Sequence, residues 1–177
     1  ATYLDRRLGT MAIEAFKGEV LDRATHGDEI VPKIAAAAPR EYLEGILPIF
    51  LRVVEQVARP SDEDLRVDGV WTYRAYNSPM YLRDALLAGL EDALRQLASD
   101  EPSLFGLYFE RLGAYGDYES VNYLLLRACT CLDEACANRA VEYMLARPVR
   151  LESGWTIVAA GAACAQYWAA REAVAHV

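Results

Sequence analysis

Cysteine and histidine are the residue types of this chain that could bind a metal ion or act as nucleophiles. The four cysteines all lie in the last third of the chain: Cys129, Cys131, Cys136 and Cys164. Cys129, Cys131 and Cys136, with either Cys164 or His176, could in principle supply four zinc ligands. If the helix continues through ACTC the spacing is poor, because residues two apart on a helix point about 200° away from each other. The sequence therefore favours small thiols that are buried as hydrophobic groups, with no metal.

The two histidines carry no pattern of a catalytic site. His26 precedes Gly27 at an expected helix end, where an imidazole can interact with the terminal carbonyls, and His176 is the second-last residue. Neither stands in a motif that would supply the partner a general base needs. The sequence also lacks a Glu-x-x-His pair, a His-Glu-x-x-His motif and a nucleophile elbow. We therefore expect no enzymatic activity and no cofactor.

Acidic side chains are the third group that could do chemistry. Residues 62–64 and Asp68 could be read as a calcium loop, but they lack the spacing, the turn glycine and the final glutamate of an EF-hand. A solvated acidic loop explains them better. The chain carries 26 Asp and Glu against 18 Lys and Arg, a net charge of −8, and its arginines are spread singly. This disfavours a nucleic-acid partner, since phosphate binding needs clustered cations.

The composition is that of a folded protein. Of the 177 residues, 54% are hydrophobic and 25% are charged, which is far from the composition of disordered chains. This length suits one domain, residues 1–177. The few cysteines fit reduced thiols in a cytoplasm better than a disulfide framework. The chain starts at Ala1 without an initiator Met or a signal-peptide pattern, so we expect a fragment of a larger protein.

The elements that must position these residues are helices. Apolar residues recur at intervals of three and four, and no stretch alternates convincingly at two, so the fold class is all-α. The first helix is expected from Tyr3 to Ala24, with a stop at Gly27. Another helix begins at Pro39, in PREYLEGILPIFLRVVEQVAR, and Pro48 should bend or split it. Its apolar run is too short to span a membrane, which takes about 20 apolar residues.

Further helices fill the chain after residue 78. Ser78 and Pro79 are the expected N-cap and first position of a helix that runs through LRDALLAGLEDALRQLA. Ser99 or Asp100 caps the next helix, EPSLFGLYFERL, which stops at Gly113. The helices YESVNYLLLRACTC and DEACANRAVEYMLAR follow. Short connections place such consecutive helices antiparallel.

Two stretches of this half are similar to each other. YLRDALLAGLEDALRQLASDEPSLFGLYFERL and VNYLLLRACTCLDEACANRAVEYMLARP each read as a leucine-rich helix, a short acidic turn and a second helix with an aromatic residue. They overlay at a spacing of about 33 to 38 residues, within the range of helical-hairpin repeats. The sequence therefore predicts antiparallel helical hairpins stacked as a short HEAT/TPR-like α-solenoid. An irregular helical bundle is the alternative.

The run PREYLEGILPIFLRVV, in which prolines interrupt apolar helices, resembles HEAT-type repeats. LRDALLAGLEDALRQLA, with ESVNYLLLRA and AVEYMLARP, resembles the helical-repeat region that follows the nucleotide-binding module in large bacterial NACHT/STAND-type signalling ATPases. The resemblance covers residues 28–150 and implies a sensor or scaffold segment of a larger regulatory protein. No GxxxxGK[ST] phosphate loop is present, so nucleotide binding is not carried over.

Residues 60–77 form a long connecting loop, acidic in its first half and aromatic in its second. The aromatic half and the helix start beyond it hold the residue types that concentrate binding energy at interfaces. They are the candidate partner-binding residues Trp71, Tyr73, Arg74, Tyr76 and Tyr81. The alternative is a lid that folds over the seam between the first helices and the repeat-like half. A lid would bury the rings, whereas a docking surface would leave several of them in solvent with Arg74.

The stretch GWTIVAAGAACAQYWAAREAVA is apolar or small at almost every position, so a helix here has no clear solvent face. Its alanines and glycine are weak membrane residues and Gln166 interrupts it, so we expect packing rather than membrane insertion. One side could await a neighbouring repeat or a second copy. Trp155, Tyr167 and Trp168 are the candidate interface residues. A homodimer through this helix is one form that the packing could take.

Three functions are compatible with these observations. The first is a non-catalytic helical-repeat scaffold or sensor module that mediates protein–protein or interdomain contacts in an intracellular regulatory protein. The second is a free-standing acidic inhibitor or immunity-type protein that binds a basic partner. The third is a small-molecule sensor whose pocket is lined by Trp71, Tyr73, Trp155 and Trp168. We expect the first.

Overall fold

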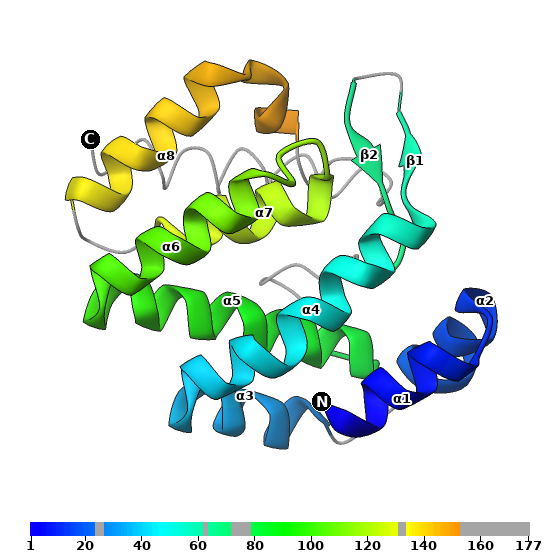
Figure 1. Ribbon diagram of the computed structural model, residues 1–177. Helices are drawn as coiled ribbons and strands as arrows, with labels where there is room; N and C mark the ends of the chain where they lie inside the picture. Colours follow the sequence, from blue (N-terminus) through cyan, green and yellow to red (C-terminus); the bar gives the residue numbers. More distant parts are fainter. Residues whose placement is uncertain (24–26, 62–63, 72–78, 131–133, 153–177) are drawn as a thin grey trace. The chain divides into compact units, whose positions relative to one another are not determined.

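The structure is a computed structural model, and the residues that it describes are 1–23, 27–61, 64–71, 79–130 and 134–152 (Figure 1). These residues are mostly helical, with one two-stranded sheet among them, which confirms the all-α class. They belong to two compact units. Ala1–Ala58 and Gly69–Ala93 make the first unit, whereas Arg59–Asp68 and the chain from Leu94 onward make the second. That residues 1–177 form one domain stays a prediction.

Helices build the first unit. Their bounds are α1 Thr2–Thr10, α2 Ile13–Phe16, the π-helical turn η1 Lys17–Leu21, α3 Gly27–Ala37, α4 Pro39–Val57 and α5 Leu82–Asp100, whose first part belongs to this unit. Helix α4 packs against α1, α2 and α3. The side chains of Leu43, Leu47 and Phe50 on α4 are fully buried, as its apolar stripe predicts. Helix α4 is therefore the helix around which this unit is built.

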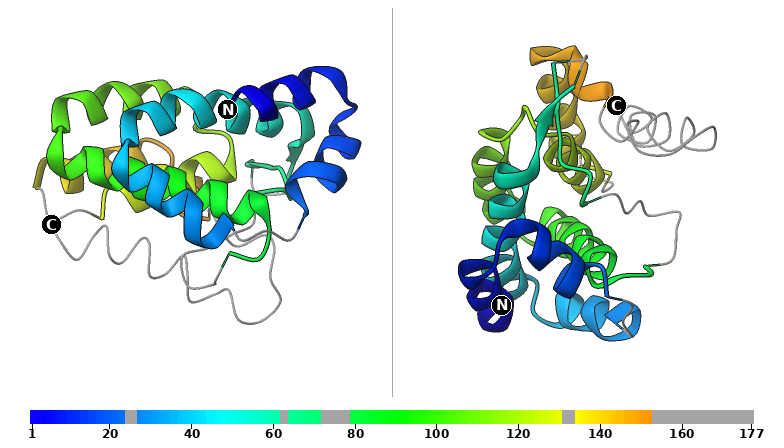
Figure 2. Two further views of the ribbon diagram at one scale, coloured as in Figure 1. Left: turned by 90° about the horizontal axis from the view of Figure 1, so that it is seen from below. Right: turned by 90° about the vertical axis from the view of Figure 1, so that its right-hand side faces the viewer.

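The expectation of one helix from Tyr3 to Ala24 is wrong. The chain leaves the helix at Met11, whose backbone is extended with φ −118° and ψ 151°, and the two views of Figure 2 show separate helical pieces in this blue part of the chain. The hydroxyl of Thr10 donates to the carbonyl oxygens of Arg6 and Arg7, at 3.0 and 3.3 Å. Such local bonds compete with the helix ladder.

Residue Gly27 does not stop a helix, contrary to expectation, but begins α3.

Helix α4 begins with a proline in its first turn, as predicted, but Pro48 does not split it. The helix runs unbroken from Pro39 to Val57. Because proline has no N–H group, the carbonyl of Glu44, four residues before Pro48, loses its helical donor. Both residues lie on the exposed face of the helix. Water can therefore satisfy the group that the proline leaves without a partner, which makes the residue tolerable in this helix.

The connecting loop of residues 60–77 contains an unexpected hairpin. Strands β1 (Arg59–Pro60) and β2 (Arg66–Val67) pair antiparallel in the second unit. Strands of two residues are too short to show alternation, so the sequence pattern gave no sign of them.

Helix α5 begins at Leu82, three residues later than the expected start at Pro79. One carboxylate oxygen of Asp84 accepts hydrogen bonds from the backbone N–H groups of Met80 and Tyr81, both at 3.0 Å. This is the arrangement in which a side chain in the first turn reaches back to the residue before the helix. The helix start is therefore fixed by Asp84, a signal inside the helix.

The second unit contains α6 Pro102–Gly113, α7 Glu119–Ala128, α8 Glu134–Ala146 and the 3₁₀ turn η2 Pro148–Glu152. Helix α6 stops at Gly113 as predicted. Its N-cap is Glu101 rather than Ser99 or Asp100, because α5 extends through both of those residues. Helix α7 ends at Ala128, before the predicted end in ACTC, and Cys129 already has a turn conformation.

A buried polar network joins the helices of the second unit. The hydroxyl of Tyr143 on α8 donates to the side-chain oxygen of Asn122 on α7 at 2.5 Å. The amide group of Asn122 in turn donates to the carbonyl of Gly116 at 3.1 Å. Phe109 of α6 packs edge to face on the Tyr143 ring, with centroids 5.4 Å apart. We call the two hydrogen-bonded side chains of this network the Asn122–Tyr143 pair.

The hairpin is tied to the start of α7 within the same unit. The backbone N–H of Arg66 donates to the carbonyl of Asp117 at 2.7 Å, and the guanidinium of Arg66 lies 5.1 Å from the centre of the Tyr118 ring. Arg147 donates to the carbonyl of Asp64 at 2.9 Å and forms an ion pair with Asp117. Two strands of two residues each are not stable through their own pairing, so these contacts hold the hairpin in place.

The contact between Tyr42 and Gly89 supplies a test of the first unit. A Cβ atom added at Gly89 would lie 2.5 Å from the hydroxyl oxygen of Tyr42, whose ring is buried and cannot withdraw freely. We expect Gly89→Ala to lower the free energy of unfolding by about 1–3 kcal/mol in chemical denaturation. Gly9→Ala is the control, because it meets open space and should leave stability unchanged or raise it by up to about 1 kcal/mol. Equal effects of the two variants would contradict the close contact.

The Asn122–Tyr143 pair supplies a test of the second unit. Tyr143→Phe leaves the buried oxygen of Asn122 without its donor, so we expect a loss of about 1–3 kcal/mol in the free energy of unfolding. Tyr3→Phe, at a ring that is 57% exposed, should cost nothing measurable.

The loss of stability in Tyr143→Phe should depend on pH. Burial raises the pKa of Tyr143 from 10.0 to about 12, against a smaller lowering by Arg150. The unfolded chain then gives up this proton before the folded chain does, so the stabilisation is complete below pH 10 and is lost between pH 10 and 12. We expect the stability difference between the wild type and Tyr143→Phe to narrow over that window in urea titrations. A difference that stays constant would refute the assignment.

Candidate functional site

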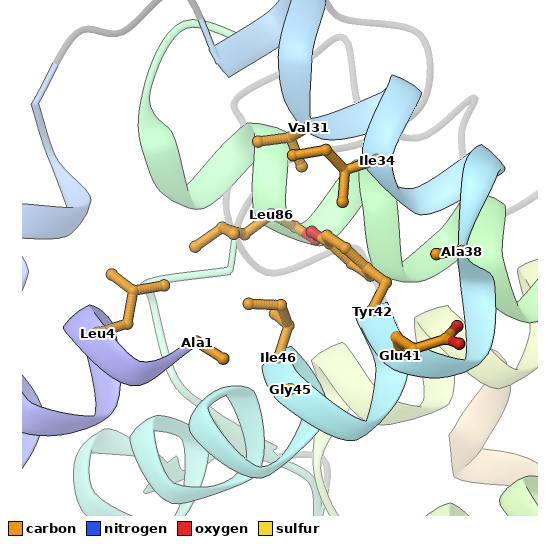
Figure 3. Close-up of a pocket in the computed structure, with 10 residues that line it drawn as sticks. All are labelled: Ala1, Leu4, Val31, Ile34, Ala38, Glu41, Tyr42, Gly45, Ile46 and Leu86. Carbon is orange, nitrogen blue, oxygen red and sulfur yellow. The ribbon is translucent and has the colours of Figure 1, made fainter.

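The first unit contains an open apolar pocket with a volume of about 290 Å³. Its wall takes side chains from four helices, as Figure 3 shows: Leu4 from α1, Val31 and Ile34 from α3, Ile46 from α4 and Leu86 from α5. We call it the α3 pocket. Because Ile34 is 51% exposed, the pocket is accessible from solvent.

The sequence of α3 explains why large apolar groups remain at the surface here. Ala35, a small residue, is fully buried, whereas Ile30 and Ile34 are 58% and 51% exposed. These two isoleucines are four residues apart and therefore lie on one face of the helix, one turn from each other. Helix α3 thus uses a small residue to pack inward and leaves its branched side chains at the pocket and beside it.

Tyr42 lies in the middle of the wall, with its hydroxyl directed to α5 (Figure 3). The hydroxyl donates to the carbonyl of Leu86 at 3.0 Å. Burial raises the pKa of Tyr42 well above its usual value, and the charge of Asp92 raises it further. The hydroxyl therefore stays protonated and engaged, so Tyr42 offers the pocket a ring face rather than an acid or a base.

Glu41 is the charged side chain in the wall. It is exposed and lies at the side of the pocket, next to Ala38 (Figure 3). Glu44 is exposed on the same helix, one turn further along. The arrangement can hold an apolar group against the isoleucines and a cation at its edge.

The residues predicted to bind a partner are only partly described. Trp71 is buried, 1% exposed, and its ring packs against Phe50 with centroids 5.3 Å apart, as the lid alternative expects for this residue. Tyr81 is half-buried, and the guanidinium of Arg83 lies 4.5 Å from its ring centre. The candidates outside the described residues are Tyr73, Arg74, Tyr76, Trp155, Tyr167 and Trp168. For these, a docking role stays a prediction.

The thiols that the structure describes are inside the protein. Cys129 and Cys136 are both buried, as predicted for packed cysteines. Cys131 and Cys164 lie outside the described residues, as do His26 and His176. In the part of the chain that is described, no three His, Cys, Asp or Glu side chains come together in a way that could hold a metal ion. Over the same ranges, no helix is long and apolar enough to cross a membrane.

The α3 pocket itself was not found from the sequence. The pocket predicted for a small-molecule sensor included Trp71, which does not line the α3 pocket. The signal available was the spacing of Ile30 and Ile34 in a short helix with only alanines and one valine as further apolar residues. That spacing indicates an apolar face, but the other walls come from distant parts of the sequence.

No protein-family model, no curated protein and no solved structure matches this chain. The function must therefore be inferred from the geometry of the pocket and of the helices around it.

Proposed function

We propose that this chain is a non-catalytic helical module that binds a protein partner at the α3 pocket and serves as a scaffold or sensor in a larger regulatory protein. The observation that carries the proposal is the open apolar pocket beside the exposed Ile30 and Ile34. Large apolar groups that gather at a surface mark places where proteins interact. An amphipathic helix laid on such a face is a common mode of recognition.

The two exposed isoleucines contribute hydrophobic free energy to binding at this face. Full burial of an isoleucine side chain contributes roughly 1.5–3 kcal/mol, and both Ile30 and Ile34 keep more than half of their surface in solvent. Leu4 and Ile46, 7% and 6% exposed, are already buried in the wall, so the newly buried surface comes chiefly from the two isoleucines of α3. Such a set is the apolar centre that protein interfaces place inside a polar rim.

The non-catalytic part of the proposal is supported by the state of the reactive groups. Burial raises the pKa values of Tyr42 and Tyr143 further above their ordinary range, and both hydroxyls donate to fixed acceptors. Cys129 and Cys136 are buried. These groups are suited to packing rather than to proton transfer or nucleophilic attack.

We further propose that α5 to α8 are two hairpins of a HEAT/TPR-like α-solenoid, related to the repeat regions of bacterial NACHT/STAND-type ATPases. The contact between Phe109 and Tyr143 supports this arrangement. These rings are 34 positions apart, within the predicted repeat spacing, and each lies on the second helix of its hairpin. Their edge-to-face packing is the contact expected between neighbouring stacked repeats.

A second candidate function is the binding of a small apolar molecule in the α3 pocket. Its volume of about 290 Å³ favours this candidate, since ligand pockets begin at roughly 300 Å³. A small ligand would fill the pocket and leave Ile30 in solvent, whereas a protein partner would cover both the pocket and Ile30.

The acidic-inhibitor alternative rests on the net charge of −8.

The proposal is tested by affinity capture from a source-cell lysate with the wild type, Ile34→Asp and Leu145→Asp. Leu145 is a matched control, because it is also an exposed aliphatic residue on a helix, 73% exposed on α8. We expect a partner that the wild type and Leu145→Asp retain and Ile34→Asp loses, with unchanged melting temperatures. The same set of partners on all three proteins would contradict a role of the α3 pocket.

Membership in a larger protein is tested by the size of the native polypeptide. An antibody raised against the chain should detect a band far above the size of 177 residues in an immunoblot of the source cells. A band at the size of the chain would instead favour the free-standing inhibitor.

A further inference from the structure

We infer that the partner segment is a basic amphipathic helix, which inserts one aliphatic or aromatic side chain into the α3 pocket and places a Lys or Arg beside Glu41. This inference rests on the proposed function and specifies the partner of the same site. It follows from the polarity of the pocket, its size, the spacing of the exposed isoleucines of α3 and the charge at the edge of the pocket.

The polarity of the pocket selects an apolar anchor. The hydroxyl is the polar group of Tyr42, and its proton is already donated to the carbonyl of Leu86. The described side chains around it are otherwise apolar, apart from Glu41 at the side. A polar side chain placed inside would give up its bonds to water without gaining a donor from the described side chains of this wall, which is costly.

The size of the pocket limits what can enter. An apolar cavity of about 150 Å³ can hold a benzene ring, so about 290 Å³ accommodates one large side chain or two small ones. The backbone of the partner must therefore remain outside, on the surface next to α3.

The exposed face of α3 has the spacing of a helix: Ile34 lines the pocket, whereas Ile30 lies on the same face without lining it. Ile30 and Ile34 are one helical turn apart on α3 and both are exposed. A partner helix that lies along α3 presents its own apolar residues at the same interval of three and four positions, so its side chains can pack around both isoleucines. A strand would present alternate residues at a different interval.

The charge at the edge selects a cation. Glu41 and Glu44 are exposed, and among the described residues no ion pair involves either carboxylate. Lys33 of α3 is exposed but does not line the pocket. The net charge of −8 adds a long-range attraction for a basic segment. A lysine or arginine that flanks the apolar anchor therefore finds its counter-charge at Glu41.

The experiment reverses the charge at chosen positions of the protein and of a probe peptide. The probe is a capped helical peptide of about 14 residues, with leucines at intervals of three and four and lysines on both flanks of that face. A second peptide carries glutamate in place of every lysine. Their dissociation constants are measured by calorimetry at low salt with the wild type, Glu41→Lys and Glu142→Lys. Glu142 is the control, because it is exposed on α8 and its replacement changes the net charge equally.

We expect the lysine peptide to bind the wild type and Glu142→Lys alike, and Glu41→Lys about two- to fivefold more weakly, as for exposed charge pairs. The glutamate peptide should show the reverse order and gain affinity on Glu41→Lys. Methyl NMR signals of Ile34 and Ile46 should shift on binding, and Ile34→Asp should abolish it.

Several results would overturn the inference. Equal effects of Glu41→Lys and Glu142→Lys, or equal affinity of the two peptides for the wild type, would remove the role of Glu41 while the pocket still binds an apolar segment. Saturation of the same methyl shifts by hexylammonium at the affinity of the peptide would assign the site to a small amphiphilic cation. No binding of either peptide would overturn the basic-helix partner, whereas the capture experiment with Ile34→Asp decides the proposed function independently.

Discussion

The close approach of the Tyr42 ring to the backbone of α5 at Gly89 is the constraint on which the first unit depends. Tyr42 fills the space that a side chain at Gly89 would occupy, and its hydroxyl bonds to the carbonyl of Leu86 one turn earlier. This contact connects α4, the helix against which α1, α2 and α3 pack, to the beginning of α5. The α3 pocket exists because the ring is held there, with Leu86 on one side of it and Val31 and Ile34 of α3 on the other.

The second unit is held together by buried polar groups rather than by a close contact between a ring and a backbone. Its helices are joined by a buried polar pair, in which Asn122 and Tyr143 satisfy each other and the turn at Gly116. Such groups are costly to bury singly but specify one register when they are paired. Arg150 adds to this, because its guanidinium lies 3.7 Å from the centre of the Tyr143 ring and it also donates to the Tyr143 carbonyl at 2.7 Å. The unit therefore has little freedom to slide one helix past another.

Periodicity was enough to predict the fold class, the apolar stripe of α4 and the end of α6 at Gly113. It failed where side chains compete with backbone bonds. The hydroxyl of Thr10 interrupts a helix that the apolar pattern continues, and the carboxylate of Asp84 sets a start that Ser78 and Pro79 indicated too early. The pocket was beyond reach for another reason: one wall comes from Ile34 and another from Leu86, and only tertiary packing brings such distant residues together.

The chain passes between the two units three times, after Ala58, after Asp68 and after Ala93. Each unit is therefore made from separate stretches of sequence. The hairpin of the second unit is translated before α5, which completes the first unit. Arg147 bonds to the carbonyl of Asp64, 83 positions earlier, so the hairpin must wait for most of the chain to be synthesised before its partner exists. In evolutionary terms, a single contiguous insertion or deletion can neither add nor remove one of these units intact.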